Sequence, residues 1–295
     1  MRLHTFVVSA LLCGVAAACV SRRVTPGHLF QPRPCAEASA AAAWPATLKG
    51  YNLERWTLAA ESDVRLEAVV LRHSTPRAVL LYYGGNSLRH CPGALEDDSL
   101  ASAALDGYRR LGLSVVLLNY RGYGGSTGRP GFESTKRDAL LLHDRIRADS
   151  ALTGLPVIVH GQSMGTLFAG YVALNRPVAA AVLESPPTNI DEVVKAGVPW
   201  YAKLFVRVKA DDQVRAQDNA GLAGGVTAPV LYVVGQRDRL TPPAMARRLY
   251  SISPSAEKRL VVVSDGRHGD LVLFSVFWEA VAALVDSATL VARPR

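Results

Sequence analysis

The sequence has no basic stripe, and this absence argues against one class of function. The net charge is +8, but the arginines are scattered in short pairs such as Arg109-Arg110. No basic stripe with interleaved aromatic residues appears, so we expect a solvated basic surface and no nucleic-acid partner. The chain also lacks internal repeats. Its 295 residues, 49% of them hydrophobic, are ordinary for one large α/β domain.

Two common ligand-binding patterns are missing as well. His90-Cys91 has no second pair of ligand residues nearby, which argues against a metal site. Residues 119–128 are rich in glycine, but their spacing misses the G-x-G-x-x-G pattern of dinucleotide-binding loops by one residue. The next residues, Arg129-Pro130-Gly131, do not read as the start of a helix. We therefore expect neither a metal nor a nucleotide cofactor.

The N-terminus has the pattern of an export signal. Residues 1–4 carry a positive charge, and residues 5–18 form an apolar run that is short for a membrane span. We therefore expect residues 1–18 to be a signal peptide. Small residues precede Cys19, as at the cleavage site of bacterial lipoproteins, although Ala16 stands where leucine is usual. A membrane lipoprotein lipidated at Cys19, a periplasmic or secreted protein and an uncleaved anchor remain open.

The four cysteines fit an oxidising compartment. Cys13 would leave with the signal and Cys19 would carry the lipid, so Cys35 and Cys91 remain as an even pair. Residues 19–50 are rich in proline and alanine and are expected to form an extended arm. The remaining pair either forms a disulfide that ties this arm to the first loop of the next domain, or stays two unrelated thiols.

Strand and helix patterns alternate from residue 51 to the C-terminus. This alternation predicts an α/β domain over 51–295, with a mostly parallel eight-stranded sheet and helices on both faces. The first two predicted strands, 53–59 and 65–71, are expected to pair as an antiparallel hairpin. A stretch of about 40 residues, 185–227, is too long for a plain connection and is expected to form a small helical cap.

One stretch, 161–165, carries the strongest functional signal. An apolar β-branched run ends at His160, and an apolar segment compatible with a helix begins at Thr166. Between them Gly161 and Gly165 flank Ser163 at a distance of two residues, which lets the chain reverse tightly. The pattern predicts a nucleophilic serine held exposed at a strand–turn–helix elbow.

A nucleophilic serine needs a base, and the base needs an acid to orient it. His268 follows the last predicted strand in a loop flanked by glycines, so it is the predicted base. Asp238 ends a glycine-containing loop after the strand predicted at 228–234, so it is the predicted acid. Glu184 also lies at a strand end and is the alternative acid.

The remaining predicted site residues surround the elbow. The backbone N–H groups of Met164 and Asn86 are predicted to stabilise the oxyanion, because one follows the nucleophile and the other lies in the loop after strand 78–83. Within the cap, Trp200, Tyr201 and Phe205 are candidate substrate-binding residues. Such groups suit an acyl chain more than a charged peptide, and a roof this small predicts short to medium chains.

In combination, these motifs resemble the α/β-hydrolase superfamily, and in particular the small-cap serine hydrolases grouped with serine aminopeptidases and acyl-protein depalmitoylases. The matching motifs lie at 82–86, 119–126, 161–165, 235–238 and 266–268. This branch often has His-Gly-Asn where the chain has Gly84-Gly85-Asn86. The resemblance implies the α/β-hydrolase fold and a serine hydrolase of carboxylic esters or thioesters that needs no cofactor. The alternatives are a serine peptidase and a membrane-tethered binding protein without activity.

Overall fold

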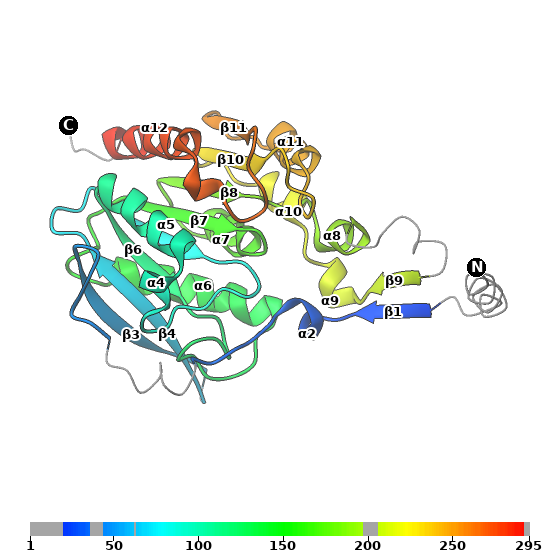
Figure 1. Ribbon diagram of the computed structural model, residues 1–295, viewed down its shortest axis with the longest axis horizontal. Coiled ribbons are helices and arrows are strands. Elements are labelled where there is room, and N and C mark those ends of the chain that lie inside the picture. The colour runs from blue at the N-terminus through cyan, green and yellow to red at the C-terminus, as the bar shows by residue number, and fades with distance from the viewer. Residues whose placement is uncertain (1–19, 36–43, 62, 197–205, 292–295) are drawn as a thin grey trace, which may run out of the picture.

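A nine-stranded sheet forms the centre of the molecule (Figure 1). The computed structural model describes residues 20–35, 44–61, 63–196 and 206–291. The strand order is β11-β10-β8-β7-β5-β6-β4-β3-β2. The strands are β2 (Thr47–Leu48), β3 (Tyr51–Glu61), β4 (Val64–Arg72), β5 (Ala78–Tyr83), β6 (Leu113–Leu118), β7 (Val157–Gln162), β8 (Ala180–Glu184), β10 (Val230–Gly235) and β11 (Lys258–Val263).

The sheet is mostly parallel, as the alternation of patterns predicts. Six neighbouring strands pair in parallel, namely β6, β5, β7, β8, β10 and β11. In contrast, β3 and β4 form the predicted antiparallel hairpin, and β4 joins β6 antiparallel. Strands such as β6 are buried along their whole length, which explains their continuous apolar sequences. The structure adds β2, a strand of two residues that is too short to give a sequence pattern.

Helices cover both faces of the sheet. The helices that flank it are α5 (Ser99–Arg110), α6 (Phe132–Arg147), α7 (Gly165–Asn175), α11 (Pro243–Ile252) and α12 (Ser275–Val291). On one face, α6, α7 and α11 pack against residues such as Val79 and Val159. On the other face, α5 and α12 pack against residues such as Leu80 and Ile158. Successive strand residues therefore point into two separate cores, as strand geometry requires.

The insertion after β8 is not purely helical. It contains the helices α8 (Ile190–Ala196), α9 (Asp212–Arg215) and α10 (Asn219–Ala223), but also the strand β9 (Val206–Ala210). This strand pairs in parallel with β1 (Val20–Val24) of the N-terminal arm, away from the main sheet (Figure 1). Valines recur in both segments and favour strand structure. A strand at 206–210 was missed because its partner lies far away in the sequence.

The N-terminal arm is fastened to the domain. After β1 it forms the short helix α2 (Pro26–Leu29), and a disulfide then joins Cys35 to Cys91 with their Cα atoms 5.7 Å apart. Of the two alternatives for these cysteines, the structure contains the bridge. No helix within the described ranges is long and apolar enough to cross a membrane. The predicted signal peptide, 1–18, and Cys19 lie outside the described residues.

Candidate active site

The predicted elbow lies between β7 and α7. Ser163 has a φ of 55°, a left-handed conformation that is costly for a residue with a side chain and that is typical of strained functional turns. The flanking positions require glycine because neither has room for a Cβ atom. A Cβ atom on Gly161 would collide with the backbone of Gly165, and one on Gly165 would collide with the carbonyl of Tyr83. The serine hydroxyl is consequently presented above the end of the strand.

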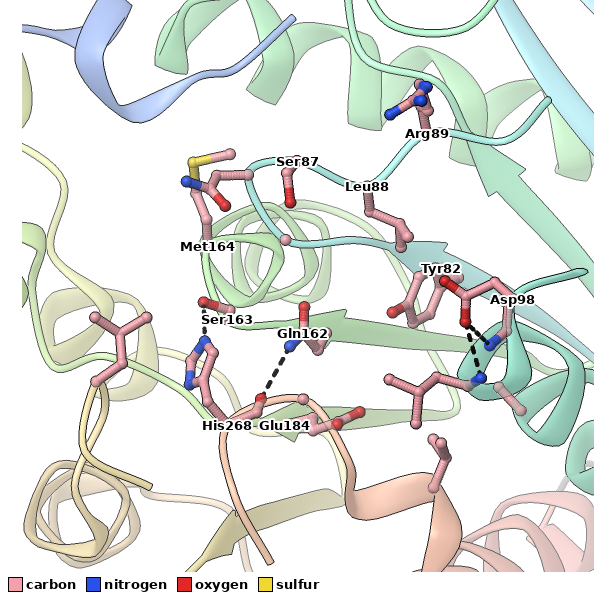
Figure 2. A pocket seen from close by; sticks show the side chains of 18 of the residues that line it. Tyr82, Ser87, Leu88, Arg89, Asp98, Gln162, Ser163, Met164, Glu184 and His268 are labelled. Atoms are coloured by element: carbon pink, nitrogen blue, oxygen red, sulfur yellow. Dashed lines mark hydrogen bonds between the residues drawn. The ribbon is translucent and has the colours of Figure 1, made fainter. Parts of the chain in front are cut away.

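A continuous chain of hydrogen bonds joins the three residues that sequence analysis singled out (Figure 2 shows Ser163 and His268). The Nε2 atom of His268 lies 2.8 Å from the Oγ atom of Ser163. The Nδ1 atom of the same ring lies 2.8 Å from Oδ2 of Asp238. The arrangement matches a Ser-His-Asp triad, in which the carboxylate orients the imidazole and the imidazole abstracts the serine proton.

The surroundings of Asp238 keep its carboxylate ionised. Burial raises the pKa of Asp238, but the hydrogen bond from His268 and the donors of Thr241 outweigh burial, so the pKa lies below its usual value. Oδ1 accepts hydrogen bonds from the N–H groups of Leu240 and Thr241, both at 2.9 Å. Asp238 thus orders the turn before α11 with one oxygen and binds His268 with the other.

The alternative acid, Glu184, binds a different histidine. Its Oε2 atom lies 3.0 Å from Nε2 of His160, and Nδ1 of His160 lies 2.7 Å from the hydroxyl of Tyr108. His160 is fully buried beneath the elbow and Glu184 is 3% exposed. The two carboxylates therefore serve separate histidines, and in the structure it is Asp238 that contacts His268.

Both predicted oxyanion donors border the nucleophile. Met164 follows Ser163 directly, and a Cβ atom on Gly85, next to Asn86, would lie 3.8 Å from Cβ of Ser163. Within the described ranges, no protein acceptor takes a hydrogen bond from the N–H of Met164 or of Asn86. Two unpaired N–H groups beside a serine hydroxyl are what a developing oxyanion needs. The carbonyl group of Asn86 accepts a hydrogen bond from the hydroxyl of Tyr123 at 2.5 Å.

Two further residues support the triad and were missed by sequence analysis. Thr241 donates its hydroxyl proton to Oδ2 of Asp238 at 2.7 Å and lies 3.1 Å from Nδ1 of His268. Gln162 donates from Nε2 to the carbonyl of His268 at 3.2 Å (Figure 2). Thr241 lies three residues after Asp238, a spacing typical of side-chain caps at a helix start. This spacing is the sequence feature that could have indicated the contact between the two residues. Nothing in the sequence indicates the contact of Gln162.

A cavity of about 1090 Å³ opens beside Ser163 and His268. Its lining also includes apolar side chains of the loop after β5, of α5 and of α8, among them Leu88, Leu100, Ala104, Leu105 and Val194. The predicted substrate-binding residues Trp200, Tyr201 and Phe205 lie outside the described residues. Among the described residues, no group of three or more histidine, cysteine or acidic side chains is placed to hold a metal ion.

Comparisons with known proteins agree with this geometry. Residues 91–221 match the model of a family described as serine aminopeptidase, S33. An uncharacterized protein of Mycobacterium tuberculosis is 34% identical over 187 residues, which cover 63% of this chain and 64% of that protein. The chain thus aligns with less than two thirds of that relative. An uncharacterized membrane protein of Saccharomyces cerevisiae is 25% identical over 237 residues, 79% of each chain.

A solved structure extends the likeness to nearly the whole fold. The esterase Pf2001 of Pyrococcus furiosus superposes with a TM-score of 0.69 at 15% identity, covering 88% of this chain and 98% of that one. At this identity the likeness concerns the fold alone. The sheet order and the structural likeness show that the chain has the α/β-hydrolase fold, and residues 91–221 are similar to the serine aminopeptidase family.

Proposed function

We propose that the protein is a serine hydrolase that cleaves carboxylic esters or thioesters through an acyl-enzyme intermediate. One observation carries the proposal: the unbroken hydrogen-bond chain from Ser163 through His268 to Asp238, with 2.8 Å at both steps. A hydroxyl at this distance from a histidine, itself oriented by a buried carboxylate, is the arrangement that activates serine at neutral pH.

The proposed reaction has two balanced halves. The Oγ atom of Ser163 attacks the substrate carbonyl while Nε2 of His268 takes its proton, and Asp238 stabilises the imidazolium. The tetrahedral oxyanion is held by the N–H groups of Met164 and Asn86. When the oxyanion collapses, His268 returns the proton to the leaving alcohol or thiol. A water molecule then repeats the sequence on the acyl-enzyme, which releases the acid and the free serine.

The cavity favours an acyl substrate over a charged peptide. Leucines at positions 88, 100 and 105 contribute to its lining, and burying each methylene of an acyl chain contributes about 0.8 kcal/mol. The volume of about 1090 Å³ slightly exceeds the range of ordinary small-molecule pockets, which span about 300–1,000 Å³. Much of this lining comes from the loop after β5 and from α5. The cavity therefore supports medium acyl chains and does not depend on the cap alone.

The test is a series of p-nitrophenyl esters of increasing chain length, with thioester and aminoacyl-amide substrates alongside. We expect ester and thioester hydrolysis by the wild-type protein and none by Ser163→Ala, with the melting temperatures of the two proteins similar. Faster cleavage of aminoacyl amides than of esters would favour a peptidase. Absence of turnover on every substrate would favour a binding protein.

We further propose that the protein works outside the cytoplasm, held at a membrane by a lipid on Cys19. The disulfide Cys35–Cys91 supports an oxidising compartment. The yeast relative is named a membrane protein, and its name adds a second, weaker support. The proposed partners are small ester or acyl substrates and the membrane, without nucleic acid.

A further inference from the structure

The loop that follows β5 carries Asn86. The hydroxyl of Tyr120 binds the carbonyl of Gly84 at the start of this loop, and three further points fasten the loop to segments that are distant in sequence. These segments are the N-terminal arm, residues 20–35, and the glycine-rich segment 119–126. We propose that Tyr123, Asn119 and the Cys35–Cys91 disulfide are positioning residues for the oxyanion side of the site, which makes the arm a working part of the active site. The proposal rests on the proposed function.

The first point is the carbonyl of Asn86 itself. It accepts a hydrogen bond from the hydroxyl of Tyr123 at 2.5 Å and another from the backbone N–H of Gln31 at 3.2 Å. The same N–H of Gln31 lies 2.6 Å from the Tyr123 hydroxyl. The three groups form a closed triangle, in which the arm and the glycine-rich segment together hold the peptide that follows Asn86.

The second point lies four residues further along the loop. The buried side chain of Asn119 accepts from the N–H of His90 at 2.8 Å and donates to the carbonyl of His90 at 2.8 Å. Asn119 also donates to the carboxylate of Glu67 at 2.9 Å, which fixes its amide orientation. Gly124 has a φ of +55°, and its missing Cβ leaves the space that Asn119 occupies. This explains why glycine stands at position 124 of the glycine-rich segment.

The third point is covalent. The disulfide joins Cys91, next to His90, to Cys35 of the arm. The arm in turn pairs with the glycine-rich segment, because the N–H of Cys35 donates to the carbonyl of Gly124 at 3.3 Å and the N–H of Gly124 donates to the carbonyl of Arg33 at 3.1 Å. Loop, arm and glycine-rich segment are therefore each joined to the other two.

The arm also contributes to the cavity. Phe30 is 2% exposed and packs against Phe132 of α6 and Phe168 of α7, with ring centroids 5.1 and 6.4 Å apart. This anchor places Val24 and Leu29 in the lining of the cavity. The arm therefore touches the site at its oxyanion loop and at its wall.

Catalysis explains why so many restraints converge on one loop. Gly84 and Gly85 leave the backbone before Asn86 free to sample several conformations, whereas misplacing a catalytic group by 1 Å can cost about 10²-fold in rate. Tyr123 serves well as a restraint because burial, partly offset by the hydrogen bond from Gln31, raises its pKa to about 12. Its hydroxyl therefore keeps its proton at every pH at which the protein is expected to act.

The first test is Tyr123→Phe, compared with Tyr83→Phe. The control also loses a buried bond from a phenol to a backbone carbonyl, that of Ala139 in α6, but one that does not hold the Asn86 loop. We expect Tyr123→Phe to lower kcat for a p-nitrophenyl ester by about 10-fold, less than the 10²–10³ for complete loss of an oxyanion donor. KM should stay within about twofold, and Tyr83→Phe should keep its kcat.

The second test breaks the disulfide in the folded protein. Dithiothreitol reduces Cys35–Cys91 to two thiols while its own thiols become a disulfide. We expect kcat of the oxidised wild-type protein to fall by about 10-fold, measured below the melting temperature of the reduced form. Cys35→Ser/Cys91→Ser should start at the lower kcat and should not respond to the reductant, which excludes effects on Cys13 and Cys19.

A second readout separates this proposal from the proposed function. Fluorophosphonate labelling of Ser163 develops charge on a phosphoryl oxygen at the oxyanion position and requires no ester substrate. Its rate constant should fall with kcat in Tyr123→Phe and in the reduced protein. If labelling slows but no ester is turned over, the ester assignment is wrong and the positioning role stands. If both rates stay within twofold while the melting temperature falls, the arm only stabilises the fold and the proposal is overturned.

Discussion

At the scale of single residues, the two buried carboxylates near the elbow have separate roles. Asp238→Asn should cost about 10⁴ in kcat, because the amide favours the wrong tautomer of His268. Glu184→Gln should retain most of its kcat, because Glu184 binds His160. Ester turnover by the two purified variants checks both expectations. An inactive Glu184→Gln beside an active Asp238→Asn would show that the acid is assigned wrongly.

The sequence predicts the residues that chemistry restricts and misses those that only the fold brings near. Ser163, Asp238 and His268 each lie at a strand end in a recognisable loop, and the structure brings all three into hydrogen-bond contact. Gln162 contacts His268, which lies 106 residues away in sequence. Tyr123 contacts Asn86, which lies 37 residues away. No local pattern encodes such a contact, so they could not be found without the structure.

At the scale of elements, the turn between β7 and α7 requires glycine because it has no room for a Cβ atom. Gly165→Ala places a Cβ atom against the carbonyls of Tyr83 and Gly84, so we expect it to lower the free energy of unfolding by about 1–3 kcal/mol or more. Gly154→Ala is the matched control, because a Cβ atom there meets nothing within 4 Å. Urea denaturation of both variants measures the difference. Equal stability of the two would mean that the elbow has more room than described.

Elements with strong local patterns were predictable, and elements made by distant pairing were not. Strands such as β6 and β7 follow from apolar runs, and the hairpin of β3 and β4 follows from their adjacency in the sequence. The pair β1–β9 joins the arm to the insertion across 186 residues, from Val20 to its partner Val206. Long-range pairing of short segments carries no period that a sequence window detects. The insertion contains helices, as expected for a small helical cap, but the strand β9 was not predicted, for this reason.

At the scale of the whole molecule, the cavity should set chain-length preference through α5. Ala104 contributes to the cavity lining and Ala103, its neighbour on the same helix, does not. Ala104→Leu should reduce kcat/KM for an octanoate ester by about 10-fold, since each lost methylene contact contributes about 0.8 kcal/mol, and should leave an acetate ester nearly unchanged. Ala103→Leu should affect neither substrate. Equal losses on both esters would show that α5 does not bind the acyl chain.

Location is also a property of the whole molecule. If Cys19 carries a lipid, the mature protein should sediment with membranes, and Cys19→Ser should release it or block its processing. Mass spectrometry of the mature N-terminus checks the expectation directly. A mature N-terminus elsewhere without lipid would contradict it and would favour a secreted or periplasmic form.

The central claim is that Ser163 is a nucleophile activated by His268 and Asp238. The most direct measurement is the mass of the folded protein after reaction with a fluorophosphonate, with the adduct mapped by peptide sequencing. One adduct is expected, on Ser163, absent from Ser163→Ala and formed far more slowly by His268→Ala. An unmodified wild-type protein, or an adduct on another residue that persists in Ser163→Ala, would contradict the account.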